Sequence, residues 1–501
     1  MFYDKNTVAY SFCNAANIPK GQKGFMHRVQ IIHDGQTESV CAGTGEKLSS
    51  VLINNGFYAE HPCGGKGMCK KCAVSVNGVT ELSCQYEINS DITVILPDRA
   101  DITSISGASE TGTVTENMCF AFDIGTTTLA LALVSIDTHS IVEVISRTNP
   151  QRIYGADIMS RIAYCKKNGA AQLHDSLITA LNKMISKLCE KYRLSGIKRL
   201  YAAGNTTMLH LFFGADCSAM GTSPYTPAFL ESQFAKADTL GIRQVEEIIS
   251  LPNISAFVGA DIVAGLGFAG LPESGRCNIL IDLGTNAEVV LYSKDFILCT
   301  AAAAGPCFEG ANISCGMSAT PGAVCSYAPD GTYSVIGGTP PIGICATGLI
   351  DIIAVFLENG IVDKTGFMEE SSFEFAEDVS VTREDIRQFQ LAKSAVYSAV
   401  MSLLEYKKIS FDDIEHTYIA GGFSAKINTK NAIKVGLIPS ALQKKIIPLN
   451  NSSLLGTAEF ACGNHLSVPI ENAEYVDLSQ NEVFSRLFID NMFFEATDER
   501  D

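Results

Sequence analysis

The stretch FDIGTTTLALALV, residues 122–134, decides the fold of most of the chain. An acidic residue, a glycine and three threonines separate two apolar segments, which predicts a β-hairpin with a tight turn. Glycine in such a turn admits positive φ and lets another backbone come close. Successive N–H groups and hydroxyls can then surround a phosphate, and the carboxylate can hold Mg²⁺ directly or through water. The candidate phosphate-binding residues of this turn are Asp123, Gly125, Thr126, Thr127 and Thr128.

The same pattern returns in IDLGTNAEVVL, residues 281–291, with Asp282 standing 159 residues after Asp123. One D-x-G-T turn is weak evidence, because such turns are common in proteins. Two of them, each between a buried strand start and an apolar run, predict a clamp around a nucleoside triphosphate. We expect Asp123 and Asp282 to be the catalytic residues, holding Mg²⁺ through water, with one of them orienting the attacking water. The second turn adds Gly284, Thr285 and Asn286 to the candidate site.

Composition narrows the class of protein. The chain has 501 residues, 47 % of them apolar, which is enough for about three domains. The net charge of −17 (37 basic against 54 acidic residues) and the lack of a basic run argue against nucleic acid and anionic membranes. No apolar run reaches the roughly 18 residues of a membrane span, and no export signal is recognisable. We expect a cytoplasmic protein whose 17 cysteines are thiols or metal ligands rather than disulfides.

The first hundred residues predict a small β-rich domain. Residues 1–26 show little periodicity and read as an extension. HRVQIIH and TESVCAG are short strands around a turn at Asp34-Gly35, and GEKLSSVLINNG predicts a helix with Thr44 as N-cap and Gly56 after its end. AVSV and DITVIL are further strands. This order predicts a β-grasp domain over residues 27–97, followed by a polar linker over residues 98–117.

Four cysteines gather in and after a glycine-rich loop of this domain. Cys63, Cys69, Cys72 and Cys84 have the spacing C-x5-C-x2-C-x11-C. Four thiolates suffice for a [2Fe–2S] cluster, and the glycines let the loop wrap an inorganic core. Structural zinc also takes four cysteines, but its sites usually pair two short knuckles. Here three ligands share one loop and the fourth stands alone, which favours a [2Fe–2S] cluster over zinc.

From Cys119 onward strands and helices alternate, which predicts α/β layers. We expect two ATPase lobes, residues 118–275 and 276–465, with residues 466–501 packing back on the first lobe. Residues 171–192 carry a helical apolar stripe. Thr382 and Asp385 form a capping-box start to a long helix that runs through Tyr406.

Further candidates follow three predicted strands, and each has a structural alternative. Asn205 and Thr206 either face the cleft or cap a helix. Glu309 and Gly310 approach the γ-phosphate or form a packing turn. Gly421 and Gly422 contact the nucleotide or form a plain turn. Asp261 is a cleft carboxylate or an N-cap. His210 reads as a core histidine, and Cys299, Cys307, Cys315, Cys325 and Cys345 read as buried thiols without a metal.

Together these motifs resemble the reductive activators of corrinoid proteins, in which a ferredoxin-like domain is joined to an ATPase of the actin, sugar-kinase and chaperone type. The resemblance implies two lobes with ATP and Mg²⁺ between them. It places the D-I-G-T-T-T and D-L-G-T-N turns in the two phosphate motifs, and Gly421-Gly422 in the adenosine motif. The matching stretches run across most of residues 27–465 and read CGGKGMC, LSCQ, DIGTTT, AAGNTTMLHLFFG, SPYTPAF, VGADIVAG, IDLGTNAE, AAAAGPCFEGANISCGM, GICATGLIDIIA and IAGGFS.

The activity implied by the resemblance is ATP-dependent electron transfer from the [2Fe–2S] cluster to an inactive Co(II) corrinoid protein, which restores Co(I) for methyl transfer. The implied partners are the corrinoid protein of a methyltransferase system, a low-potential electron donor and a second copy of the chain. Two other interpretations stay open: a small-molecule kinase with an appended redox domain, and a nucleotide-binding redox sensor. Activators of 2-hydroxyacyl dehydratases share one [4Fe–4S] cluster between two subunits, and the separate four-cysteine domain argues against that class.

Overall fold

The computed structural model describes residues 26–33, 36–55, 57, 67, 72–96, 112–155, 157–273, 275–284, 286–464 and 470–494. The chain forms two compact units, residues 1–100 and 101–501. The expected N-terminal extension and most of the expected linker lie outside the described residues. Among the helices in the described ranges, none combines the length and apolarity needed to cross a bilayer.

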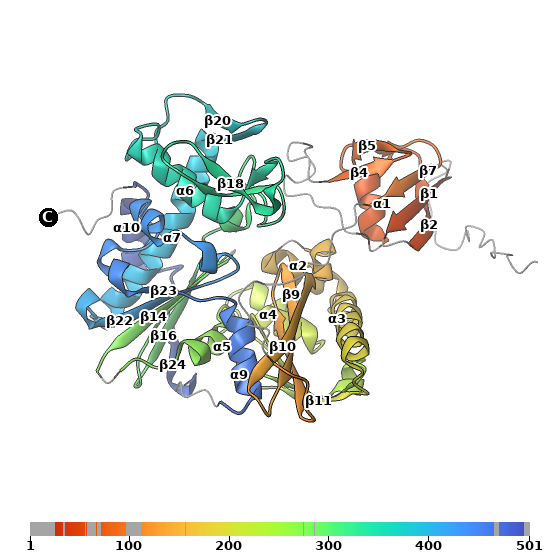
Figure 1. The fold of residues 1–501 in the computed structure, drawn as a ribbon, viewed down its shortest axis with the longest axis horizontal. Helices are drawn as coiled ribbons and strands as arrows, with labels where there is room; N and C mark the ends of the chain where they lie inside the picture. Colours follow the sequence, from red (N-terminus) through yellow and green to blue (C-terminus); the bar gives the residue numbers. More distant parts are fainter. Residues whose placement is uncertain are drawn as a thin grey trace, which may run out of the picture. The chain divides into compact units, whose positions relative to one another are not determined.

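The N-terminal unit is a mixed five-stranded sheet with one helix against it (Figure 1). The strand order is β2-β1-β7-β4-β5, with β1 and β7 parallel at the centre and antiparallel pairs on both sides. Leu48 and Leu52 of the helix pack in one core with Val29, Ile31 and Val94 of the sheet. This confirms the β-grasp fold. The elements are β1 (Met26–His33), β2 (Gln36–Gly43), β3 (Glu46–Lys47), α1 (Leu48–Asn54), β4 (Ala73–Val76), β5 (Val79–Leu82), β6 (Glu87–Ile88) and β7 (Ile92–Ile95).

The helix of this unit begins later than the sequence predicts, and Thr44 is not its N-cap. Gly45, with φ of +80°, turns the chain directly after Thr44. The next two residues pair with β6 as the short strand β3, so that ladder bonds replace the expected first helical turn. The Thr44 hydroxyl instead lies 2.9 Å from His27 Nε2. The expected end of the helix at Gly56 lies outside the described residues.

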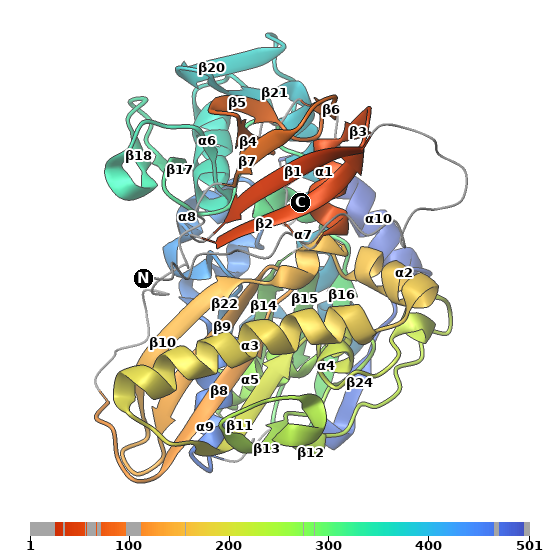
Figure 2. The same cartoon turned by 90° about the vertical axis from the view of Figure 1, so that its right-hand side faces the viewer.

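The first lobe of the second unit is a six-stranded sheet, β10-β9-β8-β11-β13-β12, with helices on both faces (Figures 1 and 2). Successive residues of a strand point to opposite faces. Phe120 and Leu131 accordingly pack with α3, whereas Ala121 and Ala132 pack against α9 from the far end of the chain. The predicted helix over residues 171–192 is confirmed as α3. The elements are β8 (Met118–Ile124), β9 (Thr128–Ser135), β10 (Ser140–Thr148), α2 (Ile158–Asn168), α3 (Ala171–Tyr192), β11 (Ile197–Gly204), α4 (Thr206–Phe212), β12 (Phe234–Lys236), β13 (Val245–Ser250) and α5 (Ala260–Ala269).

The second lobe has the order β23-β22-β14-β15-β16-β24, in which five strands repeat the topology of the first lobe and β24 adds at the edge beside β16. In each lobe a meander of three antiparallel strands is extended by a parallel strand beside its first member. Both D-x-G-T turns join the first two strands of these meanders, so the duplication seen in the sequence is present in the fold. The elements are β14 (Cys277–Leu283), β15 (Ala287–Tyr292), β16 (Ile297–Ala302), β17 (Ala323–Tyr327), β18 (Tyr333–Val335), β19 (Gly343–Ile344), α6 (Ala346–Glu358), β20 (Ser372–Ala376), β21 (Val379–Thr382), α7 (Arg383–Lys407), β22 (Ile414–Ala420), α8 (Thr429–Lys434), β23 (Ile446–Pro448), α9 (Ser452–Ala461), β24 (Ala473–Tyr475) and α10 (Glu482–Asp490).

Helices α5 and α9 join the two lobes. Val263 of α5 packs in the core of the first lobe, while Ile262 and Leu266 pack against the sheet of the second. Gly456 lets α9 cross α5 closely, because a Cβ there would lie 2.0 Å from Ala264 O. The lobe boundary predicted from the sequence, at residue 465, assigns α9 to the second lobe. Leu454 of α9 nevertheless packs on the sheet of the first lobe. The two helices therefore form the packed connection between the lobes.

Of the segment predicted to return to the first lobe, residues 473–494 pack on the second lobe instead, with β24 pairing with β16 and α10 lying on α7 (Figure 1). Ser394 Oγ donates to Phe488 O at 2.6 Å, and Gln390 Nε2 donates to Met492 O at 2.9 Å. Phe494 is buried beside Phe389 in the core of that lobe. Helix α7 itself begins at the predicted Thr382–Asp385 capping box. Helix α10 and Phe494 cover the apolar surface of α7.

Candidate functional site

The first D-x-G-T turn joins β8 to β9, and buried side chains hold its carbonyl groups. Asn149 Nδ2 donates to Gly125 O at 2.8 Å, and Asn149 N–H donates to Thr127 O at 2.9 Å. Arg161 Nη2 donates to Thr126 O at 2.6 Å. A trans peptide points its N–H opposite to its C=O, so the N–H groups of residues 126–128 point away from Asn149 and Arg161. The turn thereby presents successive N–H groups, as anion-binding nests do.

Of the glycines in the two D-x-G-T turns, Gly125 is required for close approach rather than for positive φ, and Gly284 is required for neither. Neither Gly125 nor Gly284 has positive φ, so that part of the sequence argument is wrong for both turns. A Cβ at Gly125 would lie 2.5 Å from Thr128 O, whereas one at Gly284 would make an ordinary 3.4 Å contact. Gly421 has φ of +106°, and a Cβ there would lie 2.3 Å from Leu283 O. Gly421 therefore lies directly against the strand that leads into the second turn.

The second turn lies beside the predicted adenosine motif. Asp282 pairs with Glu288 across the β14–β15 hairpin and with Ala420 of the parallel strand β22. The Gly421-Gly422 pair follows Ala420 directly, and a Cβ at Gly422 would meet open space. Asn286 closes the turn by accepting the Gly284 N–H at 3.0 Å. Thr285 lies outside the described residues.

Asn205 connects the first turn to the neighbouring strand end. Its Nδ2 donates to Thr126 Oγ1 at 3.1 Å, and its Oδ1 caps α4 by accepting the Met208 N–H at 3.0 Å. Asn205 is therefore the N-cap of α4 and also lies beside the first turn. Thr206 is buried, and its hydroxyl donates to Ser255 O at 2.6 Å inside the first lobe. Gly310 is required for packing, because a Cβ there would lie 2.4 Å from Met317 N.

Carboxylates from both lobes converge between the two turns. Burial, together with repulsion from Asp261, raises the pKa of Asp123 to about 7 and that of Asp282 to about 7. Burial also raises the pKa of Asp261, to about 6. The pKa of Glu288 is raised well above its usual value by burial and by the charges of Asp282 and Asp261. Glu309 completes the group, since its Oε2 accepts the Thr127 hydroxyl across the lobes at 3.3 Å.

The sequence analysis did not single out Ser453 or Glu288 as part of this cluster. Ser453 donates to Asp123 Oδ1 at 2.7 Å, but it comes from α9, 330 residues further along the chain. Glu288 could have been recognised from the sequence, because it is the charged residue of an apolar strand. Its side chain lies on the same face of the sheet as that of Asp282. Asp261 is a cleft carboxylate near the start of α5, with Gly259 at the N-cap. Asn149 and Arg161 had no recognisable pattern.

The burial of Asp261 gives a testable consequence for stability. The folded-state pKa of Asp261, about 6, lies above its ordinary 3.8, so ionising this group destabilises the fold as the pH rises from about 4 through 6. Asp261→Asn removes that cost while keeping an oxygen that can accept the Ile262 N–H. Because the side chain is partly open to solvent, we expect a gain of about 1–2 kcal/mol at pH 8 without nucleotide or Mg²⁺. The gain should shrink toward pH 4.

Urea unfolding at pH 8 and pH 5 measures this effect. Asp295→Asn is the control, because Asp295 is an exposed aspartate in the turn between β15 and β16. An unchanged or lower stability of Asp261→Asn at pH 8 would mean that burying the ionised Asp261 does not destabilise the fold.

The carboxylates of this site suit a cation that takes its remaining ligands from water and from substrate phosphates. Within the described residues, no three His, Cys, Asp or Glu side chains lie close enough together to chelate a metal ion. Clustered carboxylates with raised pKa values are nevertheless the environment that a divalent cation relieves. Mg²⁺ usually keeps several waters and binds one or two carboxylates plus substrate phosphates. The residues therefore fit Mg²⁺ bound through water.

In the N-terminal unit the structure brings two of the four candidate cluster ligands together. Cys72 Sγ and Cys84 Sγ lie 3.2 Å apart, at the start of β4 and just after β5. Gln85 Nε2 donates to Cys84 Sγ at 3.6 Å, and Gly67 of the loop lies against the Gln85 side chain. A pair of sulfurs with a nearby amide donor fits iron–sulfur ligation. Cys63 and Cys69 lie outside the described residues.

The other singled-out residues have structural roles. His210 is fully buried, accepts the Ala228 N–H at Nε2 and stacks on Phe229, which confirms the core histidine. Burial raises the pKa of Cys299 and of Cys307 to about 12. Cys315, Cys325 and Cys345 each lie near main-chain groups of the second lobe.

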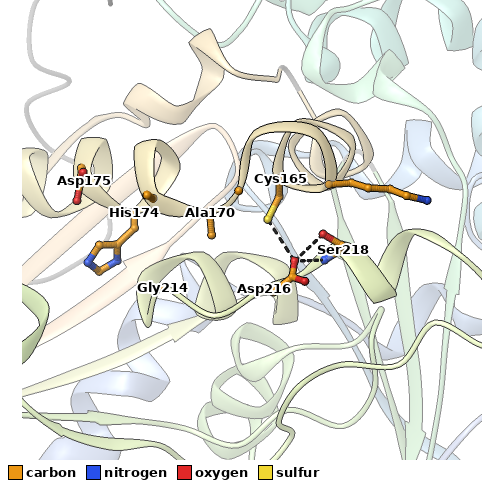
Figure 3. A pocket seen from close by; sticks show the side chains of 10 residues that line it. Cys165, Ala170, His174, Asp175, Gly214, Asp216 and Ser218 are labelled. Carbon is orange, nitrogen blue, oxygen red and sulfur yellow. Dashed lines mark hydrogen bonds between the residues drawn. The ribbon is translucent and has the colours of Figure 1, made fainter.

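A separate hollow of about 510 Å³ opens on the first lobe between the end of α2, the start of α3 and residues 214–218 (Figure 3). Asp216 Oδ1 there accepts the Ser218 hydroxyl at 2.5 Å and lies 3.5 Å from Cys165 Sγ. None of the predicted site residues lines it. The hollow is therefore distinct from the candidate site between the two D-x-G-T turns.

Comparison with known families identifies both lobes. The family model for the C-terminal domain of RACo, described as its ASKHA domain, matches residues 276–501. The model for the RACo middle region matches residues 118–274. The middle region of that family thus corresponds to the first lobe of this chain.

Individual relatives agree with these matches. The corrinoid activation enzyme RamQ of Eubacterium limosum is 32 % identical over 64 % of this chain and 60 % of RamQ, so the match spans less than two thirds of that relative. The Co(II) methylated amine-specific corrinoid protein reductase of Methanosarcina barkeri is 26 % identical over 74 % of this chain and 75 % of that protein. The solved structure of a reductive activator for corrinoid, iron-sulfur protein superposes with a TM-score of 0.68 at 25 % identity, covering 93 % of this chain and 98 % of that one.

Proposed function

Because residues 118–274 and 276–501 belong to the RACo family, we propose that this chain is an ATP-dependent activator that reduces the inactive Co(II) of a corrinoid protein to Co(I). The observation that carries the proposal is the convergence of Asp123, Asp261 and Asp282 between two D-x-G-T turns from opposite lobes. The names of the relatives, which act on corrinoid proteins, supply the substrate class.

The residues of the cleft have separate tasks in this proposal. Asp123 and Asp282 hold Mg²⁺ through water, and one of the cleft aspartates orients the attacking water. The N–H groups of residues 126–128 and of the second turn contact the phosphates, where they neutralise charge on the transferring group. Gly421 and Gly422 contact the adenosine. The Thr127 hydroxyl of the first turn donates to Glu309 of the other lobe at 3.3 Å. Because this contact joins the two lobes, nucleotide binding at the turn changes a contact that depends on lobe closure.

The N-terminal unit supplies the electron. Cys63, Cys69, Cys72 and Cys84 would hold a [2Fe–2S] cluster, which supplies a one-electron carrier when bound. A low-potential donor, not identified by the chain itself, reloads it. Carriers of this type lie near −400 mV, and a deficit of order 100 mV against Co(I) corresponds to about 2 kcal/mol. Such a deficit is small enough for ATP binding to offset by favouring a lobe arrangement that binds the corrinoid protein in a reducible state.

Anaerobic mixing with a corrinoid protein tests the proposal. We expect the cobalt spectrum to change from Co(II) to Co(I) with ATP and not without it, and ATP turnover to rise when the Co(II) protein is present. Phosphorylation of a metabolite, with turnover indifferent to corrinoid protein, would identify a kinase instead. Nucleotide binding without turnover would identify a redox sensor.

We also propose that the chain acts as a homodimer, as the resemblance implies. The expected mass is about 107 kDa, twice the 53.7 kDa of one chain. Light scattering at micromolar concentration measures this mass, and a value near that of one chain would remove the proposal.

A further inference from the structure

We propose that Arg161 is a positioning residue for the bound phosphate, acting through the main chain of the first turn rather than by touching the nucleotide. The inference rests on the proposed function, because it assumes that ATP binds at this turn. It goes further by assigning a role to a buried residue of α2 that belongs to neither phosphate motif.

The contacts of Arg161 place it behind the turn. Its Nη2 donates to Thr126 O at 2.6 Å, so the N–H of Thr127, on the same peptide, must point the other way. Its Nε donates to Gly155 O at 3.0 Å. Its Nη1 lies 3.3 Å from Gln151 Oε1 and 3.1 Å from Met208 Sδ. These contacts come from three different parts of the first lobe and fix the plane of the guanidinium.

Gln151 ties Arg161 to the second anchor of the turn. Its Oε1 also accepts a hydrogen bond from Asn149 Nδ2 at 3.4 Å, and the same Nδ2 holds Gly125 O. Gln151 is itself fixed, because its Nε2 donates to Leu173 O of α3 at 3.0 Å. The carbonyls of residues 125–127 are therefore held by one connected network built from the core of the lobe.

The burial of Arg161 argues that its charge has a use. The side chain is fully buried, and a buried charge destabilises a protein unless it is well compensated. If the only task of this side chain were to donate a hydrogen bond to Thr126 O, a neutral donor would be sufficient. A guanidinium there keeps a positive charge one peptide away from the site of a phosphate, and its planar fork fixes orientation as an ammonium cannot.

The role predicts a selective loss of affinity. Arg161→Met leaves Thr126 O without its donor, so the Thr127 peptide can rotate and its N–H loses alignment. We expect Mg·ATP to bind at least about tenfold more weakly, since hydrogen bonds to charged groups are among the stronger ones. Adenosine, which has no phosphate, should bind as it does to the unaltered protein. Arg161→Lys should recover part of the loss, because it keeps the charge but not the fork.

Calorimetric titration of Mg·ATP and adenosine into each full-length variant tests this. Arg199→Met is the matched control, because that arginine is in the same lobe and pairs with Glu247 at 3.0 Å. Equal loss of both ligands in Arg161→Met, or no loss of either, would overturn the positioning role. If the unaltered protein binds no ATP, the proposed function fails instead.

A second pair of variants keeps the test valid if Arg161→Met does not fold. Arg161→Lys is then compared with the unaltered protein in place of Arg161→Met. Gln151→Leu keeps the guanidinium but removes the hydrogen-bond acceptor of Arg161 Nη1. Both should weaken Mg·ATP more than adenosine. If Gln151→Leu folds and binds Mg·ATP as tightly as the unaltered protein, and Arg161→Lys does too, the inference is wrong.

Discussion

Asp282→Asn should lower ATP turnover by at least about a hundredfold and abolish ATP-dependent formation of Co(I), while the protein still folds and accepts electrons. The two side chains are nearly isosteric, but the substitution removes a negative charge from the proposed Mg²⁺ site. The candidate cluster cysteines belong to the other compact unit of the chain. The visible spectrum of the cluster and its reduction by a chemical donor should therefore not change.

The control for this variant is Asp295→Asn, an exposed aspartate in the turn between β15 and β16, which should retain full turnover. Phosphate release and the cobalt spectrum are measured on the same samples. Full ATP-dependent Co(I) formation by Asp282→Asn would show that the clamp assignment is wrong. Loss of electron acceptance as well would point to a general folding defect.

Cys72→Ser should remove the iron–sulfur spectrum and the reductase activity but leave Mg·ATP binding within about twofold of the unaltered protein. A serine hydroxyl is a poor ligand for iron beside thiolates, and Cys84 Sγ, 3.2 Å from Cys72 Sγ, would lose its neighbouring ligand. The unaltered protein, purified anaerobically, should contain two irons and two sulfides per chain, the composition of a [2Fe–2S] cluster. Iron and sulfide analysis, visible absorption and calorimetry measure the three quantities.

Cys325→Ser is the control for this experiment. Cys325 is a partly buried thiol of the second lobe that donates to Ser334 O at 3.5 Å, so its loss should change neither iron content nor ATP binding. Zinc without sulfide in the unaltered protein would contradict the cluster assignment. An intact spectrum in Cys72→Ser would remove Cys72 from the ligand set.

The sequence alone determined the architecture, because its signals are local and repeated. Continuous apolar runs predicted the central strands of both lobes, and the capping box at Thr382 predicted the start of α7. The two D-x-G-T turns revealed the duplicated meander. Asp123 and Asp282 were identifiable because each stands at the end of a buried strand, where a charge has no structural reason to be. Glu309 was recognisable from the glycine turn that follows an alanine-rich strand.

Only the tertiary structure decided how the site is completed, because the remaining contacts join segments far apart in sequence. Ser453 contacts Asp123 although the two residues are 330 positions apart in the sequence. Arg161 and Asn149 hold the carbonyl groups of the first turn, and neither residue belongs to a recognisable sequence motif. The role of Gly125 also changed, from permitting positive φ to permitting an approach of 2.5 Å. The C-terminal segment covers α7 because its phenylalanines fit that core. Local pattern fixes which faces are apolar, but only packing fixes which of the available faces meet.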